Sequence, residues 1–303
     1  MGDVPGVRHA GDLGGRGRAV VIGAGWVGER VTAEFERRGL ATASWSPRDV
    51  PQRADRDEHL AAFLDRVGPR LVVNAAGLRA GDEDEMLDAN VRFAARVVEL
   101  VARTDARLVH LGSAAEYGMP ASEGPIRERS ECRPAGMYGR SKLAGTQAVL
   151  EWRHRADVLV ARPFNLVGPG APPGTPVAQF AQEVAALRPM GGLVHVQWPA
   201  TVRDLITVEQ LARSLVELAS VPTLPGVVNI CSGGGVSFGE IVEALGRRRG
   251  VEVRVETSGE PGIPTVIGDP SLLRSLIGAA PQPLDPDAVA RAVWPDGQVQ
   301  NRR

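Results

Sequence analysis

Cysteine is scarce in this sequence, and only Cys132 and Cys231 occur among its 303 residues. The two lie far apart in the chain and lack the spacing of a metal site. They also do not form the dense framework that stabilises small secreted proteins. We therefore expect no bound metal, and we expect the protein to reside in a reducing cytoplasm.

Long apolar runs and an excess of charge of one sign are absent as well. No stretch is long enough to span a membrane. The formal net charge of −1 gives no general field for nucleic acid or an anionic membrane, so we expect neither as a partner. Residues 1–18 contain six glycines and no apolar segment, which predicts a disordered leader rather than a signal peptide. At the other end, residues 293–303 are expected to fray.

Lysine is rarer still, because 34 of the 35 basic residues are arginine and only Lys142 is lysine. Arginine cannot serve as a compact ammonium donor, so a lysine retained at one position indicates a chemical need. Tyrosine is also rare, and Tyr138 precedes Lys142 by one helical turn. The pair predicts two groups that face one ligand. Chance is the alternative, since an aromatic and a cation at this spacing are common on helix surfaces.

A glycine-rich turn follows the first apolar run, residues 19–22, and leads into a segment with helical periodicity. Gly23 permits a tight turn, Gly25 lets the backbone approach a pyrophosphate, and Gly28 lets the helix pack closely on the strand. The pattern predicts a dinucleotide-binding site, with a merely structural turn as the alternative. The expected contacts at the helix N-terminus include Trp26 and Val27.

The second expected strand, residues 41–45, bears on which dinucleotide binds. NAD enzymes usually carry Asp or Glu at its end, and no carboxylate stands there. Ser46 and Arg48 offer donors for a 2′-phosphate instead, so we expect NADP(H) rather than NAD(H). The alternative is a solvated Arg48 paired with Asp49. Small residues after the third strand, where a backbone must pass close to a cofactor, complete the expected cofactor site: Asn74, Ala75 and Ala76.

Apolar runs alternate with helical periodicity over most of the chain. This predicts an α/β fold, a Rossmann-like doubly wound parallel sheet with a smaller, interleaved C-terminal α/β substrate-binding region. We assign residues 19–163 to the NAD(P)-binding domain, to which residues 208–230 return. Residues 164–207 and 231–292 form the expected substrate-binding region, with a strand over 201–206.

With these motifs in place, the chain resembles the extended short-chain dehydrogenase/reductases of the NAD-dependent epimerase/dehydratase superfamily, over roughly residues 19–278. The resemblance implies a nucleotide-sugar substrate. Each motif alone is weak, but their order is specific. Besides the glycine turn and the Tyr138/Lys142 pair, they are Ser113-Ala114-Ala115-Glu116-Tyr117-Gly118, Arg162-Pro163-Phe164-Asn165, Arg203-Asp204-Leu205 and Asn229-Ile230-Cys231-Ser232-Gly233.

The resemblance also implies roles. Tyr138 would donate the proton in a ketone reduction, and Lys142 would ease formation of its anion and hold the nicotinamide ribose. Ser113 would hold the carbonyl oxygen beside Tyr138, unless it only serves a local turn. Asn165 and Arg203 match positions that contact the substrate diphosphate, with a structural Arg203 ion pair to the next residue as the alternative.

Departures from the family pattern narrow the activity. The 4,6-dehydratases carry acidic residues where this chain has Ala114 and Ala115, and the 4-epimerases generally carry the carboxylate missing after the second strand. NADPH-dependent 4-ketoreductases remain, similar to the dTDP-4-dehydrorhamnose and GDP-4-keto-6-deoxymannose reductases, although Thr146 stands where the former have Glu. The expected substrate is a nucleotide-activated 4-keto-6-deoxyhexose. An epimerase with retained NAD and a non-catalytic NADP-binding sensor stay open as alternatives.

The helix expected over residues 83–103 carries an apolar stripe that includes Met86, Val97 and Val101. Such a stripe fits either a core or a subunit interface. Many family members pair this helix and the one over residues 138–153 with their copies in a second subunit. We therefore expect a homodimer.

Overall fold

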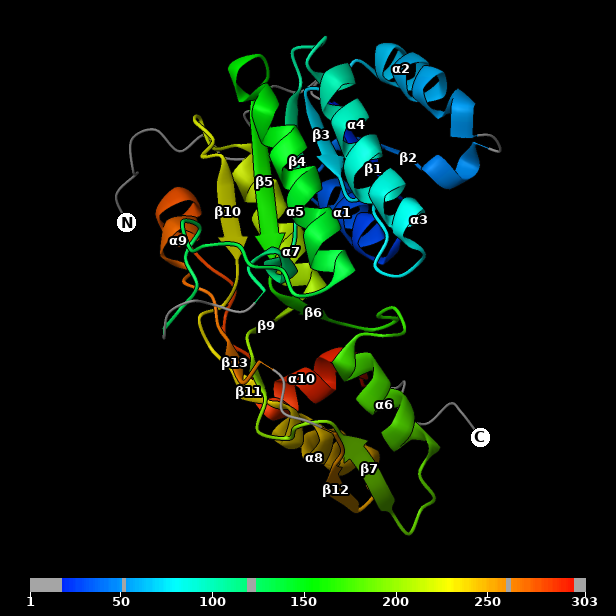
Figure 1. Cartoon of the computed structure of the whole chain (residues 1–303), viewed down its shortest axis with the longest axis vertical. Helices are drawn as coiled ribbons and strands as arrows, with labels where there is room; N and C mark the ends of the chain where they lie inside the picture. Colours follow the sequence, from blue (N-terminus) through cyan, green and yellow to red (C-terminus); the bar gives the residue numbers. More distant parts are fainter. Residues whose placement is uncertain (1–17, 51–52, 119–123, 260–262, 297–303) are drawn as a thin grey trace.

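The computed structural model of the chain describes residues 18–50, 53–118, 124–259 and 263–296, so the expected leader lies outside it apart from Arg18. Its largest element is a parallel sheet of six strands in the order β10-β5-β4-β3-β1-β2 (Figure 1). The predicted α/β class with a Rossmann-like sheet is confirmed. The strands are β1 (Arg18–Ile22), β2 (Ala41–Trp45), β3 (Leu71–Asn74), β4 (Arg107–Leu111), β5 (Val158–Pro163) and β10 (Val227–Ile230).

Helices cover both faces of this sheet. In β1, Val20 and Ile22 pack toward one face, whereas Ala19 and Val21 pack toward the other, because successive strand residues point to opposite sides. Both sides of the strand are therefore buried, as a parallel sheet requires. One face carries α2 (Arg56–Val67), α4 (Phe93–Val101) and α5 (Met137–Leu150), and the other carries α1 (Trp26–Arg37), α7 (Val208–Ala219) and α9 (Ser271–Ile277).

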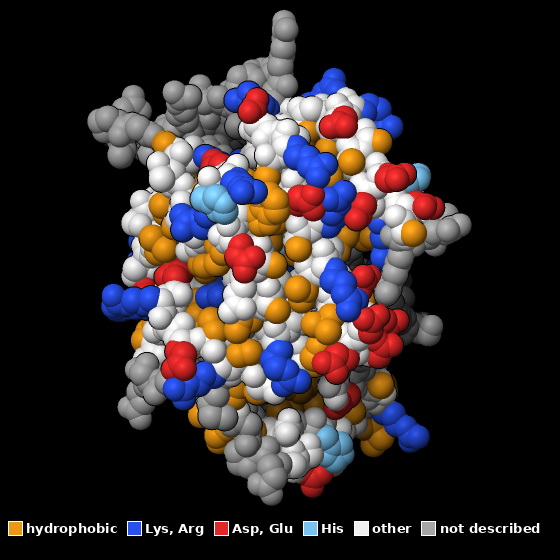
Figure 2. Space-filling view, turned by 45° about the horizontal axis from the view of Figure 1, so that its top comes forward, with side chains coloured by type: hydrophobic (Ala, Val, Ile, Leu, Met, Phe, Trp, Pro, Cys, Tyr) orange, Lys and Arg blue, Asp and Glu red, His pale blue; other side chains and the backbone are white. Residues whose placement is uncertain are grey.

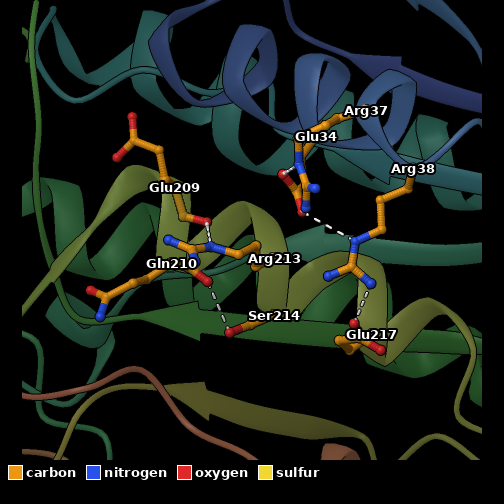
Figure 3. Close-up of polar contacts among 8 residues, drawn as sticks. All are labelled: Glu34, Arg37, Arg38, Glu209, Gln210, Arg213, Ser214 and Glu217. Atoms are coloured by element: carbon orange, nitrogen blue, oxygen red, sulfur yellow. Dashed lines mark hydrogen bonds and ion pairs between the residues drawn. The ribbon is translucent and has the colours of Figure 1, made fainter.

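Figure 3 shows the polar side chains between α1 and α7. Arg38, which follows α1, pairs with Glu217 of α7 and with Glu34 of its own helix, the latter at 3.2 Å. Such partly exposed pairs contribute only about 0.2–1 kcal/mol each, so the buried Phe35 and Leu215 beneath them supply most of the attachment. Residues 208–230, which we expected to return to this domain, contain α7, which packs on one face of the large sheet, and β10, which is one of its strands.

A second, smaller core lies beyond the carboxyl ends of the strands (Figure 1). Its centre includes Val184, Val196 and Leu245, all fully buried. It contains α6 (Pro176–Ala186), β7 (Gly192–Val196), α8 (Phe238–Arg249), β12 (Val253–Thr257) and α10 (Pro286–Val293). Short strand pairings connect it to the large sheet: β6 (Asn165–Val167), β8 (Val202–Arg203), β9 (Leu205–Thr207), β11 (Val236–Ser237) and β13 (Thr265–Val266).

The strand expected over residues 201–206 is two strands in different sheets. β8 pairs with β11 and β13, whereas β9 pairs with β6. The break falls at Asp204, whose buried carboxylate accepts hydrogen bonds from the backbone N–H groups of Ser232 at 3.0 Å and Gly233 at 2.9 Å. The backbone pairing changes partner at this residue, because the Asp204 N–H donates to the Val266 carbonyl at 2.9 Å and its carbonyl accepts from the Asn165 N–H at 3.2 Å.

The C-terminal part of the chain differs from expectation in two places. Leu273 of α9 falls in the range assigned to the substrate-binding region, yet it packs in the core of the large sheet. Arg248 donates to the carbonyl of Trp294 at 2.5 Å and pairs with Asp296 at 2.8 Å. The chain is thus held as far as Asp296, and the rest of the expected frayed tail lies outside the described residues.

The helix expected over residues 83–103 consists of α3 (Glu83–Leu87), a π-helical turn, η5 (Asp88–Arg92), and α4. Its apolar stripe is core, because Met86, Val97 and Val101 are buried within the single chain. The stripe therefore does not supply the dimer face that we inferred from it. The homodimer stays a prediction without that support.

The surface carries charges of both signs. On the face drawn in Figure 2, arginine and carboxylate side chains are interspersed rather than separated into fields of one sign. No helix in the described ranges is both long enough and apolar enough to cross a membrane.

Candidate active site

The expected site residues gather at the carboxyl edge of the large sheet, where the strand order reverses. The chain runs from β1 to β2 on one side and then returns to β3 on the other side of β1. Open α/β sheets bind ligands in the crevice outside such a point. The two loops that border it are held together, since the Ala75 N–H donates to the Ile22 carbonyl at 2.8 Å.

The three glycines after β1 are needed for different structural reasons. Gly23 has φ +101°, and a Cβ there would lie 2.7 Å from the Ala76 nitrogen. A Cβ on Gly28 would lie 1.8 Å from the Gly23 carbonyl oxygen. Around Gly25, in contrast, no atom of a described residue beyond its chain neighbours and its own helix lies within 4 Å of a Cβ placed there, and no side chain among these residues caps the helix that it begins. The open space and the uncapped N–H groups of α1 fit a pyrophosphate.

This difference predicts opposite effects for two substitutions. Gly28→Ala should destabilise the fold, by about 1–3 kcal/mol or more, because backbone must move to admit the methyl group. Gly25→Ala should leave the melting temperature nearly unchanged and weaken NADPH binding, because its methyl group meets only the space reserved for the cofactor. Thermal unfolding and fluorescence titration with NADPH measure both effects. Equal NADPH affinity of Gly25→Ala and the unaltered protein would contradict the assignment of this turn.

Trp26 and Asn74 hold the loops around this turn rather than standing free in it. The Trp26 indole N–H donates to the Pro169 carbonyl at 2.8 Å, so it ties the start of α1 to the loop after β6. The Asn74 side chain is buried, accepts from the Ala76 N–H at 3.1 Å and lies 3.1 Å from Nδ1 of His110. Asn74 thus shapes the small-residue loop, whose backbone forms the wall of the crevice. Val27 is half-buried and packs on the core under α1.

Ser46 and Arg48 lie where the sequence places them, at the end of β2. Ser46 is buried, and its hydroxyl oxygen accepts from the Arg48 N–H at 3.2 Å, which caps the short turn η3 (Pro47–Asp49). The Arg48 side chain is exposed. No ion pair between described residues involves it, so the alternative pairing with Asp49 is not seen.

Three expected catalytic side chains meet at the carboxyl edge of β4. Tyr138 and Lys142 lie one turn apart on α5, and Ser113 follows β4. The Ser113 hydroxyl and the Tyr138 phenol are hydrogen-bond partners. Lys142 is buried, and its ammonium donates to the Leu111 carbonyl at 2.5 Å, at the end of the same strand.

Burial controls the protonation of both groups on α5. It raises the pKa of Tyr138, against the opposing effects of the Ser113 hydrogen bond and the Arg79 charge. Burial lowers the pKa of Lys142 to about 8, although the negative charge of Glu116 acts in the opposite direction. Tyr138 is therefore a neutral phenol with a proton to donate, beside an ammonium that titrates within reach of neutral pH.

The residues expected to contact the substrate diphosphate are held by backbone groups. The Asn165 amide donates to the Asp204 carbonyl at 2.9 Å. The Arg203 guanidinium donates to the carbonyls of Val202 at 2.8 Å and Ile263 at 2.9 Å. The alternative ion pair of Arg203 with its neighbour is not formed, because the Asp204 carboxylate points at other partners.

A model of the NAD dependent epimerase/dehydratase family matches residues 19–231, which include the glycine turn and the Tyr138/Lys142 pair. The chain belongs to this family. The resemblance drawn from the motifs is thereby confirmed, and the nicotinamide cofactor of the family fits the uncapped glycine turn.

Three relatives indicate where the chain falls within the family. It is 33% identical over 256 residues to dTDP-6-deoxy-L-talose 4-dehydrogenase (NAD(P)(+)) of Kitasatospora kifunensis, covering 78% of this chain and 80% of the relative. It is 30% identical over 152 residues to GDP-6-deoxy-D-mannose reductase of Pseudomonas aeruginosa, covering 48% and 50%. The solved structure of RMD from Pseudomonas aeruginosa complexed with NADPH superposes with a TM-score of 0.78 at 26% identity, covering 91% and 97%.

Two residues that contact the candidate site escaped the sequence analysis as functional groups. Asn90, in the π-helical turn, donates to the Leu78 carbonyl at 2.8 Å and to the Ser141 hydroxyl at 2.9 Å, so it joins the crevice loop to α5. Arg79 lies over the Tyr138 ring, 5.7 Å from its centroid. π-Helical turns are frequent at functional sites, but nothing in the sequence marks this one.

Proposed function

We propose that this enzyme uses NADPH to reduce the 4-keto group of a nucleotide-activated 4-keto-6-deoxyhexose. The observation that carries the proposal is the meeting of Ser113, Tyr138 and Lys142 beside a glycine turn open to a cofactor. Two of the relatives support it, because one is a dTDP-6-deoxy-L-talose 4-dehydrogenase and the other is a GDP-6-deoxy-D-mannose reductase.

The reaction requires a hydride, which the bound NADPH supplies, and a proton at the carbonyl oxygen. Ser113 holds that oxygen beside Tyr138, and the phenol donates its proton to it. The Lys142 ammonium stabilises the phenolate that is left. Asn165 and Arg203 orient the diphosphate from the smaller core.

The residues after Ser113 favour a reductase over a dehydratase. Elimination of water needs an acid and a base, and Ala114 and Ala115 supply neither. Ala114 packs instead beside Phe164 in a small buried cluster. Reduction needs no group at these positions.

NADPH is expected to bind more tightly than NADH because of Arg48. A charged hydrogen bond to the 2′-phosphate contributes about 1.5–3 kcal/mol, or roughly tenfold to a hundredfold in affinity. Arg48→Ala should weaken NADPH by this factor and leave NADH nearly unchanged, as titration of both cofactors would measure. Arg66→Ala on α2 is a control that should change neither. Equal losses for both cofactors would show that Arg48 does not contact the 2′-phosphate.

The activity is tested with a panel of dTDP-, GDP-, UDP- and CDP-linked 4-keto-6-deoxysugars, following NADPH absorbance. Substrate-dependent oxidation of NADPH with at least one member is the expected result. Tight co-purification with NAD, and no oxidation of NADPH with any member, would contradict the proposal and indicate a 4-epimerase with retained NAD.

A further inference from the structure

Glu116 places a fully buried carboxylate directly behind the catalytic groups. Its Oε1 accepts from the Ser113 backbone N–H at 2.8 Å and from the Thr146 hydroxyl at 3.0 Å, and its Oε2 accepts from Arg162 Nε at 2.8 Å. A Cβ on Gly112 would lie 2.5 Å from Oε1, so a residue with a side chain at position 112 would collide with this carboxylate. One carboxylate therefore joins the end of β4, the helix α5 and the end of β5.

Two of the three joined elements carry the groups expected to react, because Ser113 follows β4 and Lys142 lies on α5. Thr146 lies one turn beyond Lys142 on α5, and Ser113 is the group expected to hold the substrate oxygen. Arg162 continues the network, since its guanidinium lies 4.7 Å from the centroid of the Tyr117 ring. The Tyr117 hydroxyl then donates to the Asn229 side chain at 2.7 Å.

A buried ion pair is poor evidence of a contribution to stability, because well-packed apolar residues often serve as well or better. In some proteins such a pair instead fixes a geometry. We propose that Glu116 is a positioning residue, whose carboxylate fixes the Ser113 backbone against α5 and so sets the placement of Ser113 relative to Lys142. Its effect on turnover rests on the proposed function, whereas its effect on Lys142 does not.

The charge of Glu116 gives this arrangement a second consequence. It raises the pKa of Lys142 against the effect of burial. The other titratable groups around Lys142 are His110 in β4, which burial and the Lys142 charge keep neutral, and Tyr138 on α5 itself. Removal of the Glu116 charge should therefore lower the pKa of Lys142.

Lys142 is the only lysine of the chain, so protein labelled with ¹³C-lysine gives a single ε-methylene NMR signal. In the unaltered protein its titration midpoint is expected at about pH 8. Glu116→Gln, which keeps the shape of the side chain, should move the midpoint to lower pH. The control is Glu131→Gln, which replaces an exposed glutamate paired with Arg133 and should leave the Lys142 midpoint unchanged. An unchanged midpoint in Glu116→Gln would overturn the proposal.

The turnover number, kcat, is the second measurement that tests the role of Glu116. Glu116→Gln should lower kcat by about tenfold to a hundredfold, as expected of a misplaced catalytic group, with little change in NADPH affinity. The exchange variant Glu116→Thr with Thr146→Glu returns a carboxylate to the same space and keeps the network if Glu116→Gln fails to fold. Recovery of the Lys142 midpoint and of kcat supports the proposal, and an exchange variant no better than Glu116→Gln overturns it. If the unaltered enzyme reduces no keto sugar, the proposed function fails, and the NMR titration still decides the role of Glu116.

Discussion

Replacement of Tyr138 by phenylalanine is expected to abolish turnover while NADPH still binds. The substitution removes the proton donor and the partner of Ser113 but keeps the aromatic ring under Arg79. A positioned general acid contributes about 10²–10⁴-fold, and kcat should fall by that factor. Steady-state kinetics and fluorescence titration with NADPH measure the two effects separately.

The only other tyrosine provides the control. Tyr117→Phe loses the buried hydroxyl that bonds Asn229 and faces Arg162, and should lower the free energy of unfolding by about 1–3 kcal/mol with little effect on kcat. A Tyr138→Phe enzyme that reduces substrate at a normal rate would show that another group donates the proton.

Lys142→Arg is expected to be almost as damaging, even though it keeps the positive charge. The lysine side chain is buried and its ammonium donates to the Leu111 carbonyl at 2.5 Å, so a longer and planar guanidinium must displace the atoms packed around it. Turnover of the unaltered enzyme should fall as the pH rises through about 8, because Lys142 then loses its proton. Any residual activity of Lys142→Arg should lack this alkaline fall, since arginine stays charged.

A pH series of kcat for both enzymes tests this expectation. Arg140→Lys, at an exposed position on the same helix, is the control and should behave like the unaltered protein. Normal turnover by Lys142→Arg would show that the single lysine is an accident of composition.

The glycine turn and the paired Tyr138 and Lys142 were predictable because each is a local pattern. A strand, a sharp turn and a helix N-terminus occupy consecutive residues, so the spacing of Gly23, Gly25 and Gly28 specifies their geometry. The large sheet was predictable for a similar reason, since several of its strands, such as β1, β3 and β5, are short apolar runs that are buried.

Contacts between distant segments were not predictable in the same way. Asn90 meets Ser141 across 51 positions, and Glu116 meets Arg162 across 46. No period or motif connects such residues, so their roles emerge only when the elements are packed together. The short strands on either side of Asp204 were predicted as one for the same reason, because their separation depends on the different remote strands with which each of them pairs.

The apolar stripe of α3 and α4 shows a further limit. Residues such as Val97 and Val101 have the same helical spacing whether they face a core or a second subunit. Only their burial in the single chain assigns them to the core.

Transfer of deuterium tests the central claim most directly. The enzyme is supplied with NADPH deuterated at the transferable position and with a 4-keto-6-deoxysugar nucleotide from the panel, and the product is examined by mass spectrometry and NMR. One deuterium at the sugar C4 is expected, in amounts equal to the NADPH consumed. A product without deuterium, formed while the added NADPH remains intact, would contradict it.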